Sequence, residues 1–356
     1  MQTNANKSGL KDEGAMGRAT AFINRFLSPL SLRLIRVSTS DAQQENSVGR
    51  LRKLDDSQSI MPHRESKQNY DAKFAYFKQV VQRPISLLIL GSAGDSLILP
   101  EDIADITTVV KFDARESADG LEAANIINIK GVVSDVSGDV VFIERSQGSC
   151  SSLLLPNPKL VRDYDLGKNF VETKRIIVNA ATINDVAGRS GINSWHYIKT
   201  DIEGMDFAVI KSIGDNIRNT VVLQMELRFE PFFMGEPFFH EVVSYLANYG
   251  FEVLDLRAER WRYKTKNMPY SSKGRATFCN VIFVNVGPLK PEITLVQALI
   301  LGLLGYSNYA EYILENRPDI ELEARNELVE FLFSKMHLND RFLPYPKFPH
   351  VIEGAE

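Results

Sequence analysis

Short apolar runs alternate with helical patterns through the middle of the chain. Apolar-rich runs of strand length lie at 85–90, 109–112, 126–133, 174–179, 197–198 and 221–227. The first of them, ISLLIL, is almost continuously apolar, as is typical of a strand buried in a parallel sheet. Apolar residues at helical spacing lie at 71–82, 182–186, 207–213 and 237–248. Two strand patterns, 251–257 and 276–285, then follow each other without a helix. This order predicts an α/β fold whose sheet is closed by an antiparallel edge strand.

The two ends of the chain differ from this middle part. Residues 1–70 contain a basic amphipathic segment followed by a flexible polar linker. Such a segment can make peripheral contact with an anionic membrane, or it can pack against its own domain. Residues 288–356 are helical in pattern, and their apolar run is too short to cross a bilayer, so we expect it to pack on the domain or on a second subunit in a homo-oligomer. We therefore predict a central α/β domain at 71–287, between an N-terminal segment at 1–70 and a C-terminal helical extension at 288–356.

Composition restricts the function classes. The net charge of −4 argues against a general nucleic-acid binder, which would carry a basic surplus. Cys150 and Cys279 are far apart and lack metal-ligand spacing, which is typical of a reducing compartment. The chain begins with polar residues and no apolar signal segment, so we expect a cytoplasmic protein. His196 and His240 could act as bases, but isolated histidines are more often structural.

One stretch, Trp195–Ile213, concentrates charge at the end of a predicted strand. Lys199, Asp201 and Glu203 follow a short apolar run, and Gly204 then separates them from an apolar helix. Ligands of open α/β sheets bind outside the carboxyl ends of the strands, so charges at this place indicate function. The alternative is structural, because carboxylates also stabilise the positive end of a helix.

A glycine turn after the first strand predicts a second part of the same site. Gly91, Ser92 and Gly94 would let the main chain approach a ligand closely. Asp113 ends the second strand, where nucleotide-binding folds hold ribose hydroxyls. Asp135, after the third strand, is a weaker candidate near an adenine. These residues together predict a nucleotide-type site beside an acidic group of side chains.

The most specific motif is IKTDIEGMDFAVIKSI, which ends at Ile213. With QMEL in the fifth strand and the Gly-Phe-x-Val-x-x-Leu run from Gly250, it resembles the signature of FkbM-type methyltransferases over about residues 85–287. The resemblance implies a Rossmann-like class I methyltransferase sheet with S-adenosylmethionine as cofactor. It also implies O-methylation of a small molecule, a sugar or a glycan.

The predicted roles follow from the chemistry of methyl transfer. The reaction is an in-line displacement, so positioning contributes much of the rate, and a hydroxyl acceptor must also lose its proton. Asp201 and Glu203 would act as a general base or as ligands of a divalent cation. Lys199 would steer an acidic acceptor or pair with Glu226. Gly91 and its turn would meet the methionine part of the cofactor.

The first glycine motif departs from the family pattern Asp-x-Gly-Ala-Asn-x-Gly. Ile89, Ala93 and Asp95 stand in the positions of the acid, the asparagine and the closing glycine. A second hypothesis is therefore a catalytically degenerate binding protein that keeps the methyltransferase fold. A third, a nucleotide-sugar oxidoreductase, is disfavoured because the chain lacks Gly-x-Gly-x-x-Gly.

Overall fold

A computed structural model describes residues 74–91, 99–114, 125–266 and 273–335. All of them belong to one compact unit, Lys67–Glu356. The predicted N-terminal amphipathic segment and linker lie outside the described residues, so the division into 1–70, 71–287 and 288–356 stays a prediction.

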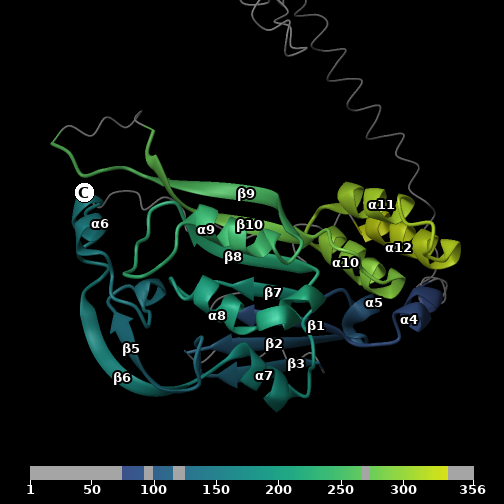
Figure 1. Cartoon of the computed structure of the whole chain (residues 1–356), viewed down its shortest axis with the longest axis horizontal. Coiled ribbons are helices and arrows are strands. Elements are labelled where there is room, and N and C mark those ends of the chain that lie inside the picture. Colours follow the sequence, from purple (N-terminus) through teal and green to yellow (C-terminus); the bar gives the residue numbers. More distant parts are fainter. Residues whose placement is uncertain (1–73, 92–98, 115–124, 267–272, 336–356) are drawn as a thin grey trace, which may run out of the picture. The chain divides into compact units, whose positions relative to one another are not determined.

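The main sheet has seven strands, of which the first five in spatial order are parallel (Figure 1). Its order is β3 (Ile126–Lys130), β2 (Thr107–Asp113), β1 (Ile85–Leu90), β7 (Tyr197–Thr200), β8 (Val222–Arg228), β10 (Arg275–Asn285) and β9 (Phe251–Trp261). The antiparallel strand β10 inserts between β8 and β9. The strand order reverses between β1 and β7, and such a switch point is where α/β sheets bind ligands.

Two hydrophobic cores, one on each face of the sheet, explain the continuously apolar strands. Leu87 and Ile89 of β1 enter one core, whereas Leu88 and Leu90 enter the other. The first core is covered by α4 (Ala75–Val81), α5 (Glu101–Ala104), α10 (Pro291–Leu303), α11 (Ser307–Glu315) and α12 (Leu322–Lys335). The second is covered by α7 (Ile183–Ser190), α8 (Asp206–Ser212) and α9 (Phe239–Ala247). The predicted α/β fold with an antiparallel edge is confirmed, and helices cover both faces of its sheet.

A second, three-stranded sheet was not predicted. Its order is β4 (Val132–Val133), β6 (Glu172–Ala181) and β5 (Gly138–Arg145). The single strand predicted at 126–133 is wrong, because the run divides at Gly131: Ile126–Lys130 pair with β2, whereas Val132 and Val133 pair with β6. The strand predicted at 174–179 exists as β6, but it lies in this second sheet and exposes Ile177.

The apolar run at 295–305 packs on its own domain. Thr294–Leu303 are buried in α10, and α10 contacts α4, α11, α12 and β8. Gln297, the polar residue in the run, donates from Nε2 to the carbonyls of Val221 and Asn285. Each apolar side of this helix therefore has a covering element. None of the helices among the described residues combines the length and apolar character that a bilayer crossing requires.

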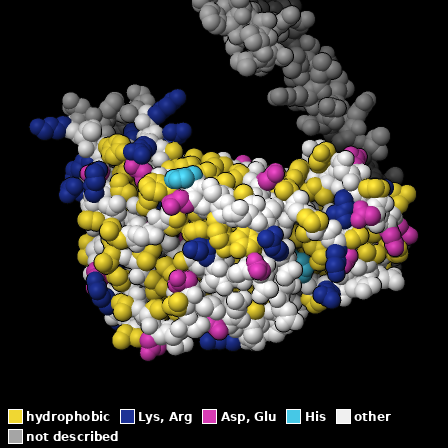
Figure 2. Space-filling model, in the orientation of Figure 1, with side chains coloured by type: hydrophobic (Ala, Val, Ile, Leu, Met, Phe, Trp, Pro, Cys, Tyr) yellow, Lys and Arg dark blue, Asp and Glu magenta, His cyan; other side chains and the backbone are white. Residues whose placement is uncertain are grey.

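The remaining short helices are η3 (Gly148–Cys150), α6 (Pro158–Asp163) and η4 (Gly214–Asn219). Lys and Arg side chains gather near α6 and the end of the β9–β10 pair, whereas charges of both signs are mixed over the rest of the face seen in Figure 2. Two of these cations have acidic partners, because Lys159 pairs with Asp163 and Lys264 with Asp165. The basic character of this end is therefore partly neutralised.

Candidate active site

Three strand ends meet at the switch point of the sheet. The Gly91 N–H donates to the Phe112 carbonyl at 3.0 Å, and the Asp201 N–H donates to the Leu90 carbonyl at 3.1 Å. These two bonds place Gly91, which follows β1, between Asp113 at the end of β2 and Asp201 after β7. Three of the predicted site residues therefore lie side by side. Ser92 and Gly94 fall outside the described residues.

Gly91 is required by the close approach of two main-chain segments. Its φ of +76° is in the left-handed region, and a Cβ at this position would lie 1.9 Å from the Asp201 carbonyl oxygen. We expect Gly91→Ala to lower the free energy of unfolding by about 2 kcal/mol or more, because the left-handed conformation alone costs roughly 1–2 kcal/mol. Urea unfolding measures this change. Gly188→Ala is the matched control: nothing lies within 4 Å of its added Cβ in α7, and we expect a gain of roughly 0.5–1 kcal/mol.

A tight turn presents the next carboxylate, that of Glu203. Glu203 and Gly204 have φ values of +50° and +91°, so the chain reverses between β7 and α8. The segment after η3 packs on this turn, because the hydroxyl of buried Ser152 donates to the Glu203 carbonyl at 2.6 Å. On the other side, a Cβ on Gly204 would lie 2.8 Å from the Phe233 ring. The backbone of Glu203 is thus held from two directions.

Asp201, Glu203 and Glu226 form a carboxylate cluster. One oxygen from each residue lies within 4.8 Å of the oxygens of the other two. Glu226 joins the cluster because Thr200 of β7 and Met225 of β8 are neighbours in the sheet, which sets the next residues side by side. Oxygens at this spacing can share a divalent cation or accept hydrogen bonds from neighbouring hydroxyls. Both predicted uses of Asp201 and Glu203 therefore fit the geometry.

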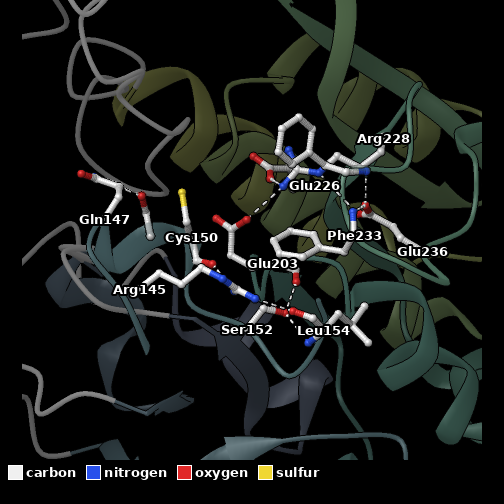
Figure 3. A network of polar contacts seen from close by, with 12 residues as sticks. Arg145, Gln147, Cys150, Ser152, Leu154, Glu203, Glu226, Arg228, Phe233 and Glu236 are labelled. Atoms are coloured by element: carbon white, nitrogen blue, oxygen red, sulfur yellow. Dashed lines mark hydrogen bonds and ion pairs between the residues drawn. The ribbon is translucent and has the colours of Figure 1, made fainter. Parts of the chain in front are cut away.

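A buried arginine, which sequence reasoning had not assigned to the site, joins two members of the cluster (Figure 3). Arg228 Nη2 lies 2.6 Å from Glu226 Oε1 and 3.1 Å from Glu203 Oε2. Its Nε lies 3.4 Å from Glu236 Oε1. The pattern Glu226-x-Arg228 at the end of a central strand was the available signal, since both residues lie on one face. Glu236 follows in an irregular loop and has no such signal.

Burial has the largest effect on the pKa values of the carboxyl groups in this site. It raises the pKa of Glu203 well above its usual range, although the nearby Arg228 opposes the shift. It raises the pKa of Glu226 to about 8, again against Arg228, while Asp201 adds to the rise. The pKa of Arg228 is also raised, because Glu226, Glu203 and Glu236 together outweigh its own burial. Removing the arginine would therefore favour protonated carboxyls.

Asp206, the first residue of α8, gives a stability signature. Burial raises its pKa to about 7 and neighbouring Asp201 adds to the rise, so the folded state holds a proton that the unfolded chain releases near its much lower pKa. This group's stabilisation is complete below the unfolded pKa and is lost as the pH rises toward 7. We expect the free energy of unfolding to fall more steeply between about pH 4 and about pH 7 in the wild type than in Asp206→Asn. Urea titrations at several pH values test this, and equal slopes would contradict it.

The other predicted residues occupy different surroundings. Lys199 is buried in β7, with Ile89 of β1 and Gln224 of β8 as its register neighbours, and its two predicted roles stay predictions. Asp135 is exposed and accepts a hydrogen bond from Ser134 Oγ at 3.1 Å. His196 is structural: the Ser86 N–H donates to its Nδ1 at 3.0 Å, and burial lowers its pKa to about 4.

A known family profile matches the part of the chain that carries the carboxylate cluster. Residues 128–253 match the profile of the methyltransferase FkbM domain. This segment of the chain is similar to the FkbM methyltransferase domain. The matched segment runs from β3 into β9 and includes Asp201, Glu203, Glu226 and Arg228. It begins after Gly91 and Asp113, so the altered glycine motif lies outside the match. The family assignment supports the predicted methyltransferase activity and its cofactor, S-adenosylmethionine.

Solved structures give weaker comparisons. A 1,6-didemethyltoxoflavin-N1-methyltransferase from Burkholderia thailandensis, with S-adenosylhomocysteine bound, is 10% identical, with a TM-score of 0.25 and coverage of 71% of this chain and 93% of that one. A precorrin-6y C5,15-methyltransferase from Geobacter metallireducens is 12% identical, with a TM-score of 0.26 and coverage of 65% and 95%. Among curated proteins, none matches significantly. Because these TM-scores are low, the solved structures add no argument. The fold is established by the strand order of the sheet itself.

Proposed function

We propose that this domain transfers a methyl group from S-adenosylmethionine to a hydroxyl of a sugar, a glycan or a related metabolite. The adjacency of Gly91, Asp113 and the carboxylate cluster at the switch point carries the proposal. The free Cys150 and Cys279 are consistent with the predicted cytoplasmic location.

The cofactor would lie across the ends of β1 and β2. A side chain at Gly91 would collide with the Asp201 carbonyl, so the glycine keeps this strand end narrow and leaves main chain facing the ligand. Asp113 would accept hydrogen bonds from the ribose hydroxyls, as acids at the second strand end do in nucleotide-binding folds. When bound, S-adenosylmethionine supplies an electrophilic methyl group. The protein's own residues then position the acceptor and remove its proton.

The acceptor hydroxyl would meet the carboxylate cluster. Asp201 is the residue of the cluster whose main chain touches Gly91, so we assign it the role of general base. Glu203 and Glu226 would accept hydrogen bonds from neighbouring hydroxyls of the same acceptor, which suits the closely spaced hydroxyls of a sugar. A pKa of about 8 leaves Glu226 able to exchange a proton near neutral pH. A divalent cation on the same three oxygens is the alternative use of the cluster.

One observation favours the second candidate, a binding protein that has lost catalysis. Ile89 stands where the family has an acid, and its side chain is buried in the core against α10 and its neighbours. That position therefore offers no carboxylate to a cofactor. The two candidates differ in whether S-adenosylmethionine binds at all.

Methyl transfer with radiolabelled S-adenosylmethionine tests the proposal. The purified protein is incubated with a panel of neutral and acidic sugars, sugar nucleotides and glycans, with and without a chelator. Label appearing in an acceptor hydroxyl supports the proposal, and loss of that label in the chelator would assign the cluster to a cation. Absence of cofactor binding at millimolar concentration would contradict the proposal and favour the binding protein.

A further inference from the structure

Arg228 pairs with three acidic side chains, which is more than is needed to join β8 to the loop that follows it. It ends β8 with 7% of its side chain exposed, and its guanidinium lies 4.8 Å from the ring of Phe278, its register neighbour on β10. A single ion pair to Glu236 would join the strand to the following loop. Instead one nitrogen, Nη2, reaches Glu226 and Glu203, which belong to different strand ends and to the same carboxylate cluster.

Glu236 fixes the direction of this arginine. Its Oε2 accepts hydrogen bonds from the N–H groups of Phe232 and Phe233 at 2.8 and 3.0 Å, so the carboxylate is held by the backbone of its own loop. Its Oε1 faces Arg228 Nε. With Nε in a 3.4 Å ion pair with Glu236 and Cζ over the ring of Phe278, Nη2 lies toward the cluster. Planar guanidinium groups suit such fixed, multiple contacts better than lysine does.

We propose that Arg228, oriented by Glu236, is a positioning residue that aligns Glu203 and Glu226 in the carboxylate cluster for the acceptor. This inference rests on the proposed function. Arg228 does not itself touch the acceptor. It supplies the positive charge that lets two closely spaced carboxylates keep defined directions, leaving Asp201 to act on the hydroxyl.

The charged groups around Glu203 and Glu226 determine the effect of removing Arg228. The groups that face Glu203 or Glu226, apart from each other, are Arg228, Asp201, Asp206, Glu236, Arg145, Cys150 and Cys279. Acidic groups outnumber the arginines, so removing Arg228 leaves carboxylates that repel one another. They would then take up protons at higher pH than in the wild type.

Two variants test the inference. Arg228→Met removes the charge and keeps an extended side chain. Glu236→Gln removes only the group that orients Arg228, leaves the cluster intact and covers the case in which Arg228→Met does not fold. Glu230→Gln is the matched control, because Glu230 is also a buried acid beyond β8 with an arginine partner, Arg275, at 2.8 Å.

The first readout needs no substrate. Carbon NMR of protein labelled at the glutamate carboxyls follows each titration, and Glu203→Gln and Glu226→Gln assign the signals. We expect the Glu203 and Glu226 titrations to move upward by about one pH unit or more in Arg228→Met and by less in Glu236→Gln, with no change in Glu230→Gln. Unchanged Glu203 and Glu226 titrations in both variants would overturn the inference.

The second readout is the pH profile of methyl transfer. We expect the acidic limb of kcat to move to higher pH in Arg228→Met and Glu236→Gln, with the affinity for S-adenosylmethionine unchanged. Shifted titrations with an unmoved rate profile would overturn the positioning role. If the wild type transfers no methyl group while the titrations shift as expected, the proposed function fails and the control of the cluster by Arg228 stands.

Discussion

Asp201→Asn is expected to lower the rate of methyl transfer by roughly 10²–10⁴-fold, the range typical of a lost general base. The amide keeps the size of the side chain but cannot accept the acceptor's proton. The affinity for S-adenosylmethionine should stay within a few fold, because Asp201 meets Gly91 through its main-chain carbonyl, which the substitution leaves in place. Radiolabelled transfer measures the rate, and calorimetry measures the affinity.

The control for this variant is Asp215→Asn. Asp215 is an exposed aspartate in η4, beyond the far end of the helix that follows the Asp201 turn. Its loss should leave both the rate and the affinity unchanged. Turnover that persists in Asp201→Asn would remove this residue from the chemistry and transfer the base role to Glu203 or Glu226.

Asp113→Ala is expected to weaken the binding of S-adenosylmethionine by roughly 10–100-fold or more. Hydrogen bonds to a charged group are worth about 1.5–3 kcal/mol each, and about 1.4 kcal/mol corresponds to a tenfold change in affinity. The effect should fall on binding, because Asp113 lies at the end of β2 and the carboxylate cluster lies beyond Gly91. Isothermal calorimetry gives the dissociation constants directly.

Asp105→Ala is the matched control for Asp113→Ala. Asp105 precedes the same strand at its opposite end, where it is exposed and pairs with Lys78 at 2.8 Å. The affinity of Asp105→Ala for S-adenosylmethionine should equal that of the wild type. Equal affinities of the wild type and Asp113→Ala would mean that the ribose is held by another part of the chain.

The strands of the main sheet could be predicted because their sequence signal is local. Ile85–Leu90 is apolar at each position apart from Ser86, and the structure buries both of its faces in separate cores. The N-terminal cap of α7 is also encoded locally, by Thr182 and an acid three residues later. The Thr182 hydroxyl accepts from the Asp185 N–H, and the Asp185 carboxylate accepts from the Thr182 N–H.

The second sheet could not be predicted from the same signal. Val132 and Val133 continue the apolar run of β3, and only their pairing with Ala180 and Ala181 of β6 shows that the chain has left the first sheet. In β6 the side chain of Ile177 is 75% exposed, so an apolar residue in this strand does not indicate a buried central strand. For both β4 and β6, the sheet to which the strand belongs is set by pairing with a segment distant in the sequence, which a local pattern does not encode.

The residues of the site also fall into two groups, those that the sequence could predict and those that it could not. Gly91, Asp113 and Asp201 were predictable because each directly follows or ends a strand, and parallel strands end at one edge. The grouping of Glu226 with Asp201 and Glu203 depends on the register between β7 and β8. The link from Arg228 to Glu236 depends on a loop conformation, and no periodic pattern encodes it.

A crystal structure with bound S-adenosylhomocysteine tests the shared site most directly. We predict that Asp113 binds the ribose hydroxyls, that the Gly91 main chain lines the pocket, and that the sulfur faces Asp201, Glu203 and Glu226. A ligand bound elsewhere, or a sulfur separated from these carboxylates by packed side chains, would contradict the proposed methyl transfer.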